Sequence, residues 1–250
     1  MSGGAVPNSR TVDVVSIDGP IGSGKSSVAF ELARLLGRTC ISTGMMYRAV
    51  ALIVRDGRPY DRASFACEVA RVSHFEFTSR PDSLRICVDG TDVTDEVSDP
   101  SILPLTSEIA QHPGLRTALL RCQREMALRE PSVIEGRDAN TQIVPTARWK
   151  FYLDAPPEVR YRRLHDVHKL SAISPLEYAE FVRTMELVDE RDRGRLRESS
   201  RQADVIHHEN FAHLSALQDA VILYYYIFRS EEIRRNASIS RTISAPTAKS

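Results

Sequence analysis

The stretch Thr11-Val-Asp-Val-Val-Ser-Ile-Asp-Gly19-Pro-Ile-Gly-Ser-Gly-Lys25-Ser26 decides the fold of this chain. Its first part, residues 11–17, is rich in β-branched side chains and is typical of a buried parallel strand. The glycine-rich part fits the pattern G-x-x-x-x-G-K-[ST], and apolar residues at helical spacing follow it. Because strand, glycine loop and helix come in this order, we predict a phosphate-binding loop at residues 19–26.

The chemistry of this loop suits a nucleoside triphosphate. Glycines let successive backbone N–H groups face a phosphate, and the start of the next helix adds its positive dipole. Lys25 can reach the β- and γ-phosphates, and the hydroxyl of Ser26 can ligate Mg²⁺. We therefore expect ATP as co-substrate, with Mg²⁺ as cofactor. The predicted ATP-binding residues are Gly19, Pro20, Ile21, Gly22, Ser23, Gly24, Lys25, Ser26 and Ser27.

Strands and helices alternate along most of the remaining chain. This pattern predicts an α/β fold of three layers around a central parallel sheet, as in P-loop NTPases. The loop then lies at the carboxyl end of its strand, where such folds bind ligands. Further strands are expected at 39–42, 132–135, 149–154 and 204–207. Further helices are expected at 45–56, 115–129 and 214–228. Two more helices should flank residues 171–175, and the second of these should end near residue 192.

Residues 60–113 differ from the rest of the chain in their pattern of expected helices and strands. A short helix is followed by two alternating segments, 74–78 and 84–89, which predict a small α+β insertion. The core is then formed by 11–59 together with 114–230. We expect the polar stretches 1–10 and 231–250 to be disordered.

Composition excludes several classes of protein. Lys plus Arg and Asp plus Glu both number 33, so no basic field indicates a nucleic-acid partner. The widely spaced Cys40, Cys67, Cys87 and Cys122 favour neither a zinc site nor a disulfide framework. The apolar run 220–228 is too short to span a membrane, and the first residues lack the apolar core of a signal peptide. We expect a cytoplasmic monomer.

A phosphate-binding loop occurs in kinases, GTPases and motor ATPases alike. The chain has no N-K-x-D motif for guanine, and 250 residues leave little room for the machinery of a motor. A kinase of small molecules remains, and such an enzyme needs a second anion site for its acceptor.

Several further motifs resemble the cytidylate kinase family. The matching pieces are Ile17-Asp-Gly-Pro-Ile-Gly-Ser-Gly-Lys25, Ser42-Thr-Gly-Met-Met-Tyr-Arg48, Glu135-Gly-Arg-Asp138, Phe151-Tyr-Leu-Asp-Ala155 with Arg160, and Glu190-Arg-Asp-Arg-Gly-Arg195. The resemblance covers roughly residues 12–225 and implies transfer of a phosphoryl group from ATP to CMP or dCMP. It also implies that the insertion 60–113 binds the nucleoside monophosphate, and that helices within about 156–200 form a lid.

The resemblance assigns roles to individual side chains. It implies that Ser107, Arg116 and Asp138 lie at the cytosine edge, whose N4 amino group donates while N3 and O2 accept. The acceptor phosphate would be held by Arg48 and Arg137, with Thr43 and Tyr47 close by. Asp192 and Arg195 resemble the pair that contacts the sugar. The implied catalytic residues are Lys25, Arg137, Arg160 and Arg163, of which Arg160 and Arg163 lie one helical turn apart and resemble lid arginines that close over the donor phosphates.

Five positions depart from the family pattern. Ser42 replaces an Asp, Ile21 a Ser, Ser26 a Gly, Asn140 a Gly and Val188 an Arg. Loss of the polar groups at Ile21 and Val188 predicts weaker acceptor binding, while the base-edge residues are kept. Two alternatives stay open: a kinase of another small acceptor, and a nucleotide-binding protein with impaired transfer.

Overall fold

A computed structural model describes residues 13–57, 60–167, 174–210 and 214–243. Its centre is a parallel sheet of five strands in the order β2-β6-β1-β7-β8. The strands are β1 (Val14–Asp18), β2 (Thr39–Ser42), β6 (Ser132–Gly136), β7 (Trp149–Asp154) and β8 (Val205–Glu209). The predicted parallel sheet is therefore confirmed, with β1 in the middle and the glycine loop at its carboxyl end.

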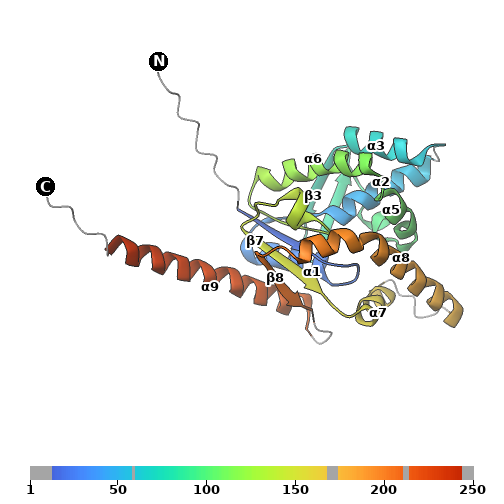
Figure 1. Ribbon diagram of the computed structural model, residues 1–250. Helices are drawn as coiled ribbons and strands as arrows, with labels where there is room; N and C mark the ends of the chain where they lie inside the picture. The colour runs from blue at the N-terminus through green and yellow to red at the C-terminus, as the bar shows by residue number, and fades with distance from the viewer. Residues whose placement is uncertain (1–12, 58–59, 168–173, 211–213, 244–250) are drawn as a thin grey trace, which may run out of the picture.

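Helices cover both faces of this sheet, as the side-chain alternation of β1 requires (Figure 1). Val15 and Ile17 belong to a core shared with α1 (Lys25–Leu36) and α9 (Ala216–Ile243), two helices that pack against each other. Val14 points to the opposite face, where its core includes Ala127 of α6 (Pro113–Arg129). The expected three layers are present.

The segment between α2 (Thr43–Gly57) and α6 forms an antiparallel sheet in the order β3-β4-β5, with helices around it. The two predicted strands correspond to β3 (Phe75–Ser79) and β4 (Leu84–Val88). Their buried side chains, such as Ile86, share one core with Met46 and Val50 of α2. The remaining elements are α3 (Arg62–Val72), β5 (Thr91–Asp92), α4 (Thr94–Ser98), the 3-10 turn η1 (Pro100–Ile102) and α5 (Leu103–Ile109).

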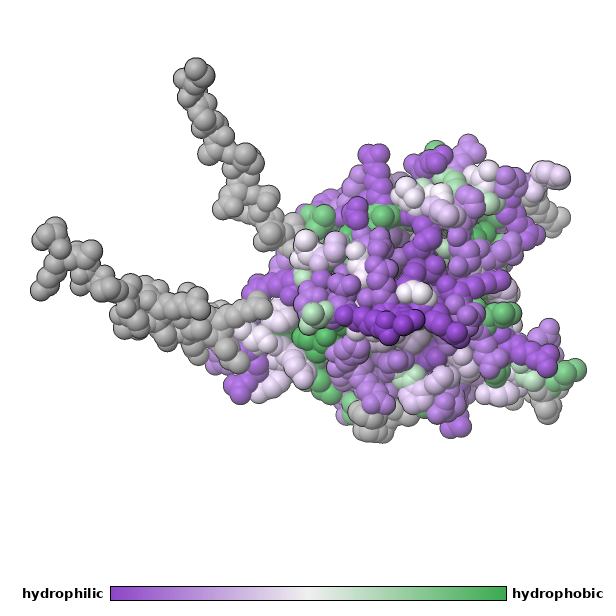
Figure 2. Space-filling model, viewed as in Figure 1, coloured by the Kyte–Doolittle hydropathy of each residue, from purple (hydrophilic) through white to green (hydrophobic). Residues whose placement is uncertain are grey.

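Two further helices, α7 (Pro157–Val167) and α8 (Pro175–Ser200), lie between β7 and β8. Helix α8 begins with a capping box formed by Ser174 and Glu177. It continues past Asp192, where we expected it to end, because Leu196 and Ser199 of its last turns are buried. The outward face of α8 forms a strongly hydrophilic band across the molecule (Figure 2).

Helix α9 is also longer than expected. It runs from Ala216 to Ile243, so residues 231–243 of the segment 231–250, which we predicted to be disordered, are helical. No glycine or proline interrupts residues 216–243, and Arg229 pairs with Glu232 one turn on at 3.6 Å. The predictions for residues 1–10 and for 244–250 lie outside the described residues. Within the described helices, none combines the length and apolar character needed to cross a membrane.

Candidate active site

The phosphate-binding loop has a backbone shape that only glycine permits at two positions. Gly22 and Gly24 have φ values of +73° and +87°. A Cβ at Gly24 would lie 2.4 Å from Nδ2 of Asn210, and one at Gly22 would lie 2.6 Å from the carbonyl oxygen of Arg160. The loop is therefore packed directly on the segments after β8 and in α7, which hold its conformation.

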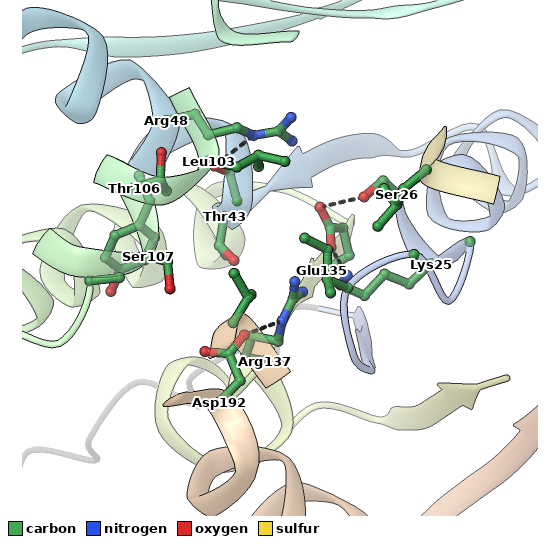
Figure 3. Close-up of a pocket in the computed structure, with 18 of the residues that line it drawn as sticks. Lys25, Ser26, Thr43, Arg48, Leu103, Thr106, Ser107, Glu135, Arg137 and Asp192 are labelled. Carbon is green, nitrogen blue, oxygen red and sulfur yellow. Dashed lines mark hydrogen bonds and ion pairs between the residues drawn. The ribbon is translucent and has the colours of Figure 1, made fainter. Parts of the chain in front are cut away.

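A cavity of about 710 Å³ opens beside this loop. Its walls come from the loop, the starts of α2 and α6, helices α5, α7 and α8, and the segments after β6 and β8. Figure 3 shows Lys25, Arg48 and Arg137 arranged around this space with Glu135 and Asp192. The volume lies within the range typical of small-molecule sites.

Lys25 and Ser26 meet a buried carboxylate at the end of β6. Ser26 Oγ donates to Oε1 of Glu135 at 3.1 Å, and Lys25 Nζ lies 3.9 Å from Oε2. The hydroxyl of Ser42 also donates to Glu135, so the residue that stands in place of an Asp supports this carboxylate. A serine hydroxyl beside a carboxylate is a donor set that suits Mg²⁺ bound together with phosphate oxygens. Ser26 and Glu135 could therefore hold that ion.

Positive charge is concentrated at the same place. Burial, together with the nearby Arg137, lowers the pKa of Lys25 to about 7, although Glu135 opposes the shift. Burial also lowers the pKa of Arg48, whose Nε and Nη1 donate to the carbonyl oxygens of Gly44 and Val97, each at 3.3 Å. This unfavourable crowding of cations is relieved when an anion binds among them.

Arg137 is held by Asp192 of α8. Its Nε donates to Oδ2 of Asp192 at 2.8 Å, and Arg195 donates to the other oxygen of the same carboxylate. Burial would raise the pKa of Asp192, but the two guanidinium groups offset it, so the pKa lies below its usual value. The structure thus joins Arg137, Asp192 and Arg195 in one charged network on the cavity wall.

A second carboxylate–guanidinium pair lines the same cavity. Arg116, in the first turns of α6, donates directly to Oδ2 of Asp138, which follows β6. Tyr47 lies within the electrostatic influence of both pairs, and burial raises the pKa of its phenol to about 12, so it stays protonated. Ser107 also lines the cavity, where its hydroxyl accepts from Nη1 of Arg191 at 3.1 Å. Thr43 completes this wall at the start of α2.

The two expected lid arginines are separated by the structure. Arg163 lines the cavity, and its Nη1 is buried without a hydrogen-bond partner among the described residues. Arg160 is instead buried beneath the loop. It donates to the carbonyl oxygens of Ala155 and Ile21 at 2.9 and 2.8 Å, and to both oxygens of Asp189 at 3.1 and 2.7 Å.

The expectation that Arg160 closes over the donor phosphates is thus not met by its position here. Asp189 on α8 supplies a bidentate partner that draws the guanidinium away from the cavity. Arg160 ties the phosphate-binding loop to α7 and α8 in this arrangement.

Three residues that depart from the family pattern, Ile21, Val188 and Asn140, make defined contacts in the structure. Ile21 and Val188 both line the cavity and belong to one buried apolar cluster with Tyr161 and Met185. The two replacements therefore exchange polar groups on neighbouring elements for a shared apolar contact. Asn140 is buried too, accepting from Ser16 Oγ at 2.6 Å and donating to the carbonyl oxygen of Phe151 at 3.0 Å.

Sequence reasoning missed three residues of this site. No role was predicted for Glu135, although its place at a strand end beside Gly-Arg-Asp is a usable signal. Asp189 lies one residue from the motif that contains Asp192, and Asn210 directly follows β8. No sequence spacing marks Asp189 or Asn210, because each contacts a residue that is distant in sequence.

A Walker A loop that shares one cavity with a second cluster of partly buried guanidinium groups defines the class of protein. Such a site is that of a P-loop phosphotransferase, with one anion site for the donor and one for the acceptor.

Comparison with known proteins gives the family. The cytidylate kinase family model matches residues 15–209. A cytidylate kinase of Caldanaerobacter subterraneus subsp. tengcongensis is 38% identical over 182 residues, 72% of this chain and 79% of the relative. A cytidylate kinase of Geobacter sulfurreducens is 36% identical over 192 residues, 76% of this chain and 82% of the relative. The chain belongs to the cytidylate kinase family.

Proposed function

We propose that this protein transfers the γ-phosphoryl group of ATP to CMP or dCMP. The observation that carries this proposal is the Arg116–Asp138 pair on the wall of the cavity that also contains Lys25, Arg48 and Arg137. The proposal is supported by relatives named cytidylate kinases, which are 36 to 38% identical over most of their length.

The base pocket offers the groups that cytosine needs. Asp138 has an acceptor oxygen for the N4 amino group, and Arg116 has several N–H groups for N3 or O2. Uracil presents a carbonyl oxygen where cytosine presents the amino group, so the carboxylate of Asp138 would meet an acceptor. Because a buried polar group left unpaired costs more than a lost contact, we expect strong discrimination against UMP.

The reaction needs no covalent intermediate on the protein. A phosphate oxygen of the acceptor is already a nucleophile, so the protein has to align it with the γ-phosphorus and stabilise the charge that develops. We assign Arg48 and Arg137 to the acceptor phosphate, and Lys25 and Arg163 to the donor phosphates. Ser26 and Glu135 would hold Mg²⁺, which neutralises phosphate charge when bound.

The sugar environment supports acceptance of both ribose and deoxyribose. Val188 lies one helical turn before Asp192 and, like Ile21, presents only carbon atoms to the cavity. A 2′-hydroxyl gains no hydrogen bond from either side chain. We therefore propose that CMP and dCMP are both substrates and that acceptor binding is weaker than in relatives with polar groups at these positions.

The test is direct identification of the products. ATP, Mg²⁺ and each of CMP, dCMP, UMP, AMP and GMP are incubated with the protein, and the nucleotides are separated by anion-exchange chromatography. Stoichiometric formation of ADP with CDP or dCDP is the expected result. Binding of ATP without transfer to any monophosphate, or faster transfer to UMP, would overturn the proposal.

A further inference from the structure

Asn210 occupies a position that connects three parts of the donor side of the cavity. It directly follows β8, is only 4% exposed and lines the cavity beside the phosphate-binding loop. Its backbone N–H donates to the carbonyl oxygen of Asp154 at 2.8 Å, which fixes the residue to the end of β7. The side chain therefore projects from a rigid point of the sheet.

Both halves of the Asn210 amide are used, and each contacts a different partner. Nδ2 donates to the carbonyl oxygen of Ser23 at 2.8 Å, and Oδ1 accepts from Nη2 of Arg163 at 2.9 Å. The backbone oxygen of Asn210 accepts from the same Nη2 at 3.2 Å. The amide orientation is determined by these partners, since the reverse would set oxygen against oxygen and nitrogen against guanidinium.

The bond to Ser23 sets the direction of a peptide in the loop. In a trans peptide the C=O and the next N–H point in opposite directions. Holding the oxygen of Ser23 toward Asn210 therefore turns the N–H of Gly24 away from Asn210. A free carbonyl in this loop could instead turn toward an anion and repel it. The close packing of Gly24 on Asn210 fits such a restraint, because a Cβ there would lie 2.4 Å from Nδ2.

The bond to Arg163 leaves the Nη1 amino group of that side chain unused among the described residues. Nη2 is engaged by Asn210, whereas Nη1 is buried with no hydrogen-bond partner within the described part of the chain. A Cβ at Gly24 would lie 3.8 Å from Nη1, so this unused donor is beside the loop. An unpaired buried guanidinium N–H next to a phosphate-binding loop is suited to a donor phosphate oxygen.

From these contacts we propose that Asn210 is a positioning residue for the donor nucleotide. It fixes the Ser23–Gly24 peptide and aims Arg163 at the same phosphates, so that one amide aligns two elements of the donor site. This inference rests on the proposed function, because it assumes that ATP occupies the loop. It predicts that loss of the Asn210 amide weakens the binding of ATP and leaves the binding of the acceptor unchanged.

The decisive variant is Asn210→Asp, which is nearly the same size. A carboxylate still accepts from Arg163 but cannot donate to Ser23, and it places an acceptor against an acceptor. Asn210→Ala removes both contacts, and Arg163→Ala with the double variant measures their coupling. Gln202→Ala, at an exposed amide in the turn before β8, is the matched control.

The affinity for a non-hydrolysable ATP analogue with Mg²⁺ is measured by calorimetry, alongside the KM values for ATP and for CMP. Asn210→Asp is expected to weaken ATP-analogue binding by about tenfold or more while the KM for CMP changes by less than about twofold. Asn210→Ala should cost clearly less in the Arg163→Ala background than in the wild type, and Gln202→Ala should change nothing.

Unchanged affinity for the ATP analogue in Asn210→Asp, or equal rises in the KM values for ATP and CMP, would overturn this inference. The proposed function would still stand in that case, provided that the wild-type protein forms CDP. A wild-type protein that binds no ATP analogue would overturn both.

Discussion

The Nε atom of Arg137 lies 2.8 Å from Oδ2 of Asp192, a bond that joins the end of β6 to helix α8. Because Arg195 holds the second oxygen of the same carboxylate, Asp192 fixes two guanidinium groups at once. The charge of Arg137 is therefore oriented before any nucleotide binds, which reduces the reorganisation needed during transfer.

Replacement of Arg137 by Met is expected to lower kcat/KM for CMP by a factor of about 10² to 10³, as for loss of a preorganised charge. The control variant is Arg193→Met, because the Arg193 side chain on α8 is 72% exposed and pairs with Glu190 one turn earlier. Steady-state kinetics of both variants check this. Equal activity of Arg137→Met and Arg193→Met would contradict the assigned role.

Glu135 is expected to govern the response to Mg²⁺. Glu135→Gln keeps the shape of the side chain but removes the negative charge beside Ser26, so the Mg²⁺ concentration for half-maximal activity should rise by about tenfold or more. A titration of activity with Mg²⁺ at saturating ATP measures this. The exposed Glu130, which accepts from Thr39 at 2.6 Å, provides the control Glu130→Gln. An unshifted Mg²⁺ midpoint in Glu135→Gln would be inconsistent with a role in holding the ion.

The affinity for ATP should depend on pH through Lys25. Its pKa is about 7 in the nucleotide-free protein because of burial and Arg137, and a bound triphosphate raises it. The contribution of the ammonium is thus fully present below about pH 7 and is lost as the pH rises above it toward the raised pKa of the complex. Binding of a non-hydrolysable ATP analogue, measured from about pH 6 to about pH 9, should weaken accordingly.

The variant Lys25→Arg separates this effect from ionisation of the nucleotide. A guanidinium keeps its charge over the whole range, so its binding should retain only the pH dependence of the nucleotide itself. Identical pH profiles for the wild type and Lys25→Arg would show that Lys25 is already fully charged in the free protein.

Asn140 is expected to contribute to stability. Asn140→Gly restores the residue usual in the family but leaves Ser16 and the carbonyl oxygen of Phe151 without their buried partner. The free energy of unfolding should fall by about 2 kcal/mol or more, measured by urea denaturation. Gln142→Gly in the same turn, η2 (Ala139–Ile143), controls for the flexibility of glycine because its side chain is exposed. A similar loss in both variants would assign the effect to the backbone alone.

The sequence was sufficient to predict the loop and the parallel sheet. The resemblance to the cytidylate kinases placed Arg116 and Asp138 together at the cytosine edge, but their direct ion pair was not predicted. The loop is local, since strand, glycines and Lys25 are consecutive, and alternation with helices implies a parallel sheet. The strand order was not predictable, because it depends on which crossovers the chain takes between distant strands. Contacts between residues at the ends of neighbouring strands that are distant in sequence were not predicted, for the same reason. Ser26 meets Glu135, which lies 109 residues further along the chain, only because β6 lies beside β1 in the sheet.

Arg160 and Arg163 show where helical spacing is an insufficient guide. Residues three apart share a face of a helix, and the resemblance to the cytidylate kinases implied that both arginines act over the donor phosphates. Their long side chains instead extend to different partners, Asp189 on α8 and Asn210 after β8. Those partners lie 29 and 47 residues away, so the spacing within α7 contains no information about them.

The central claim is that Asp138 and Arg116 recognise cytosine beside a loop that holds ATP. It is tested most directly by the ratio of kcat/KM for CMP to that for UMP, measured in the wild type and in Asp138→Asn. We expect a ratio of about 10² or more in the wild type and a fall of about tenfold or more in the variant, because the amide of Asn can donate to O4 of uracil. A wild-type ratio near unity, or one that Asp138→Asn leaves unchanged, would contradict the claim.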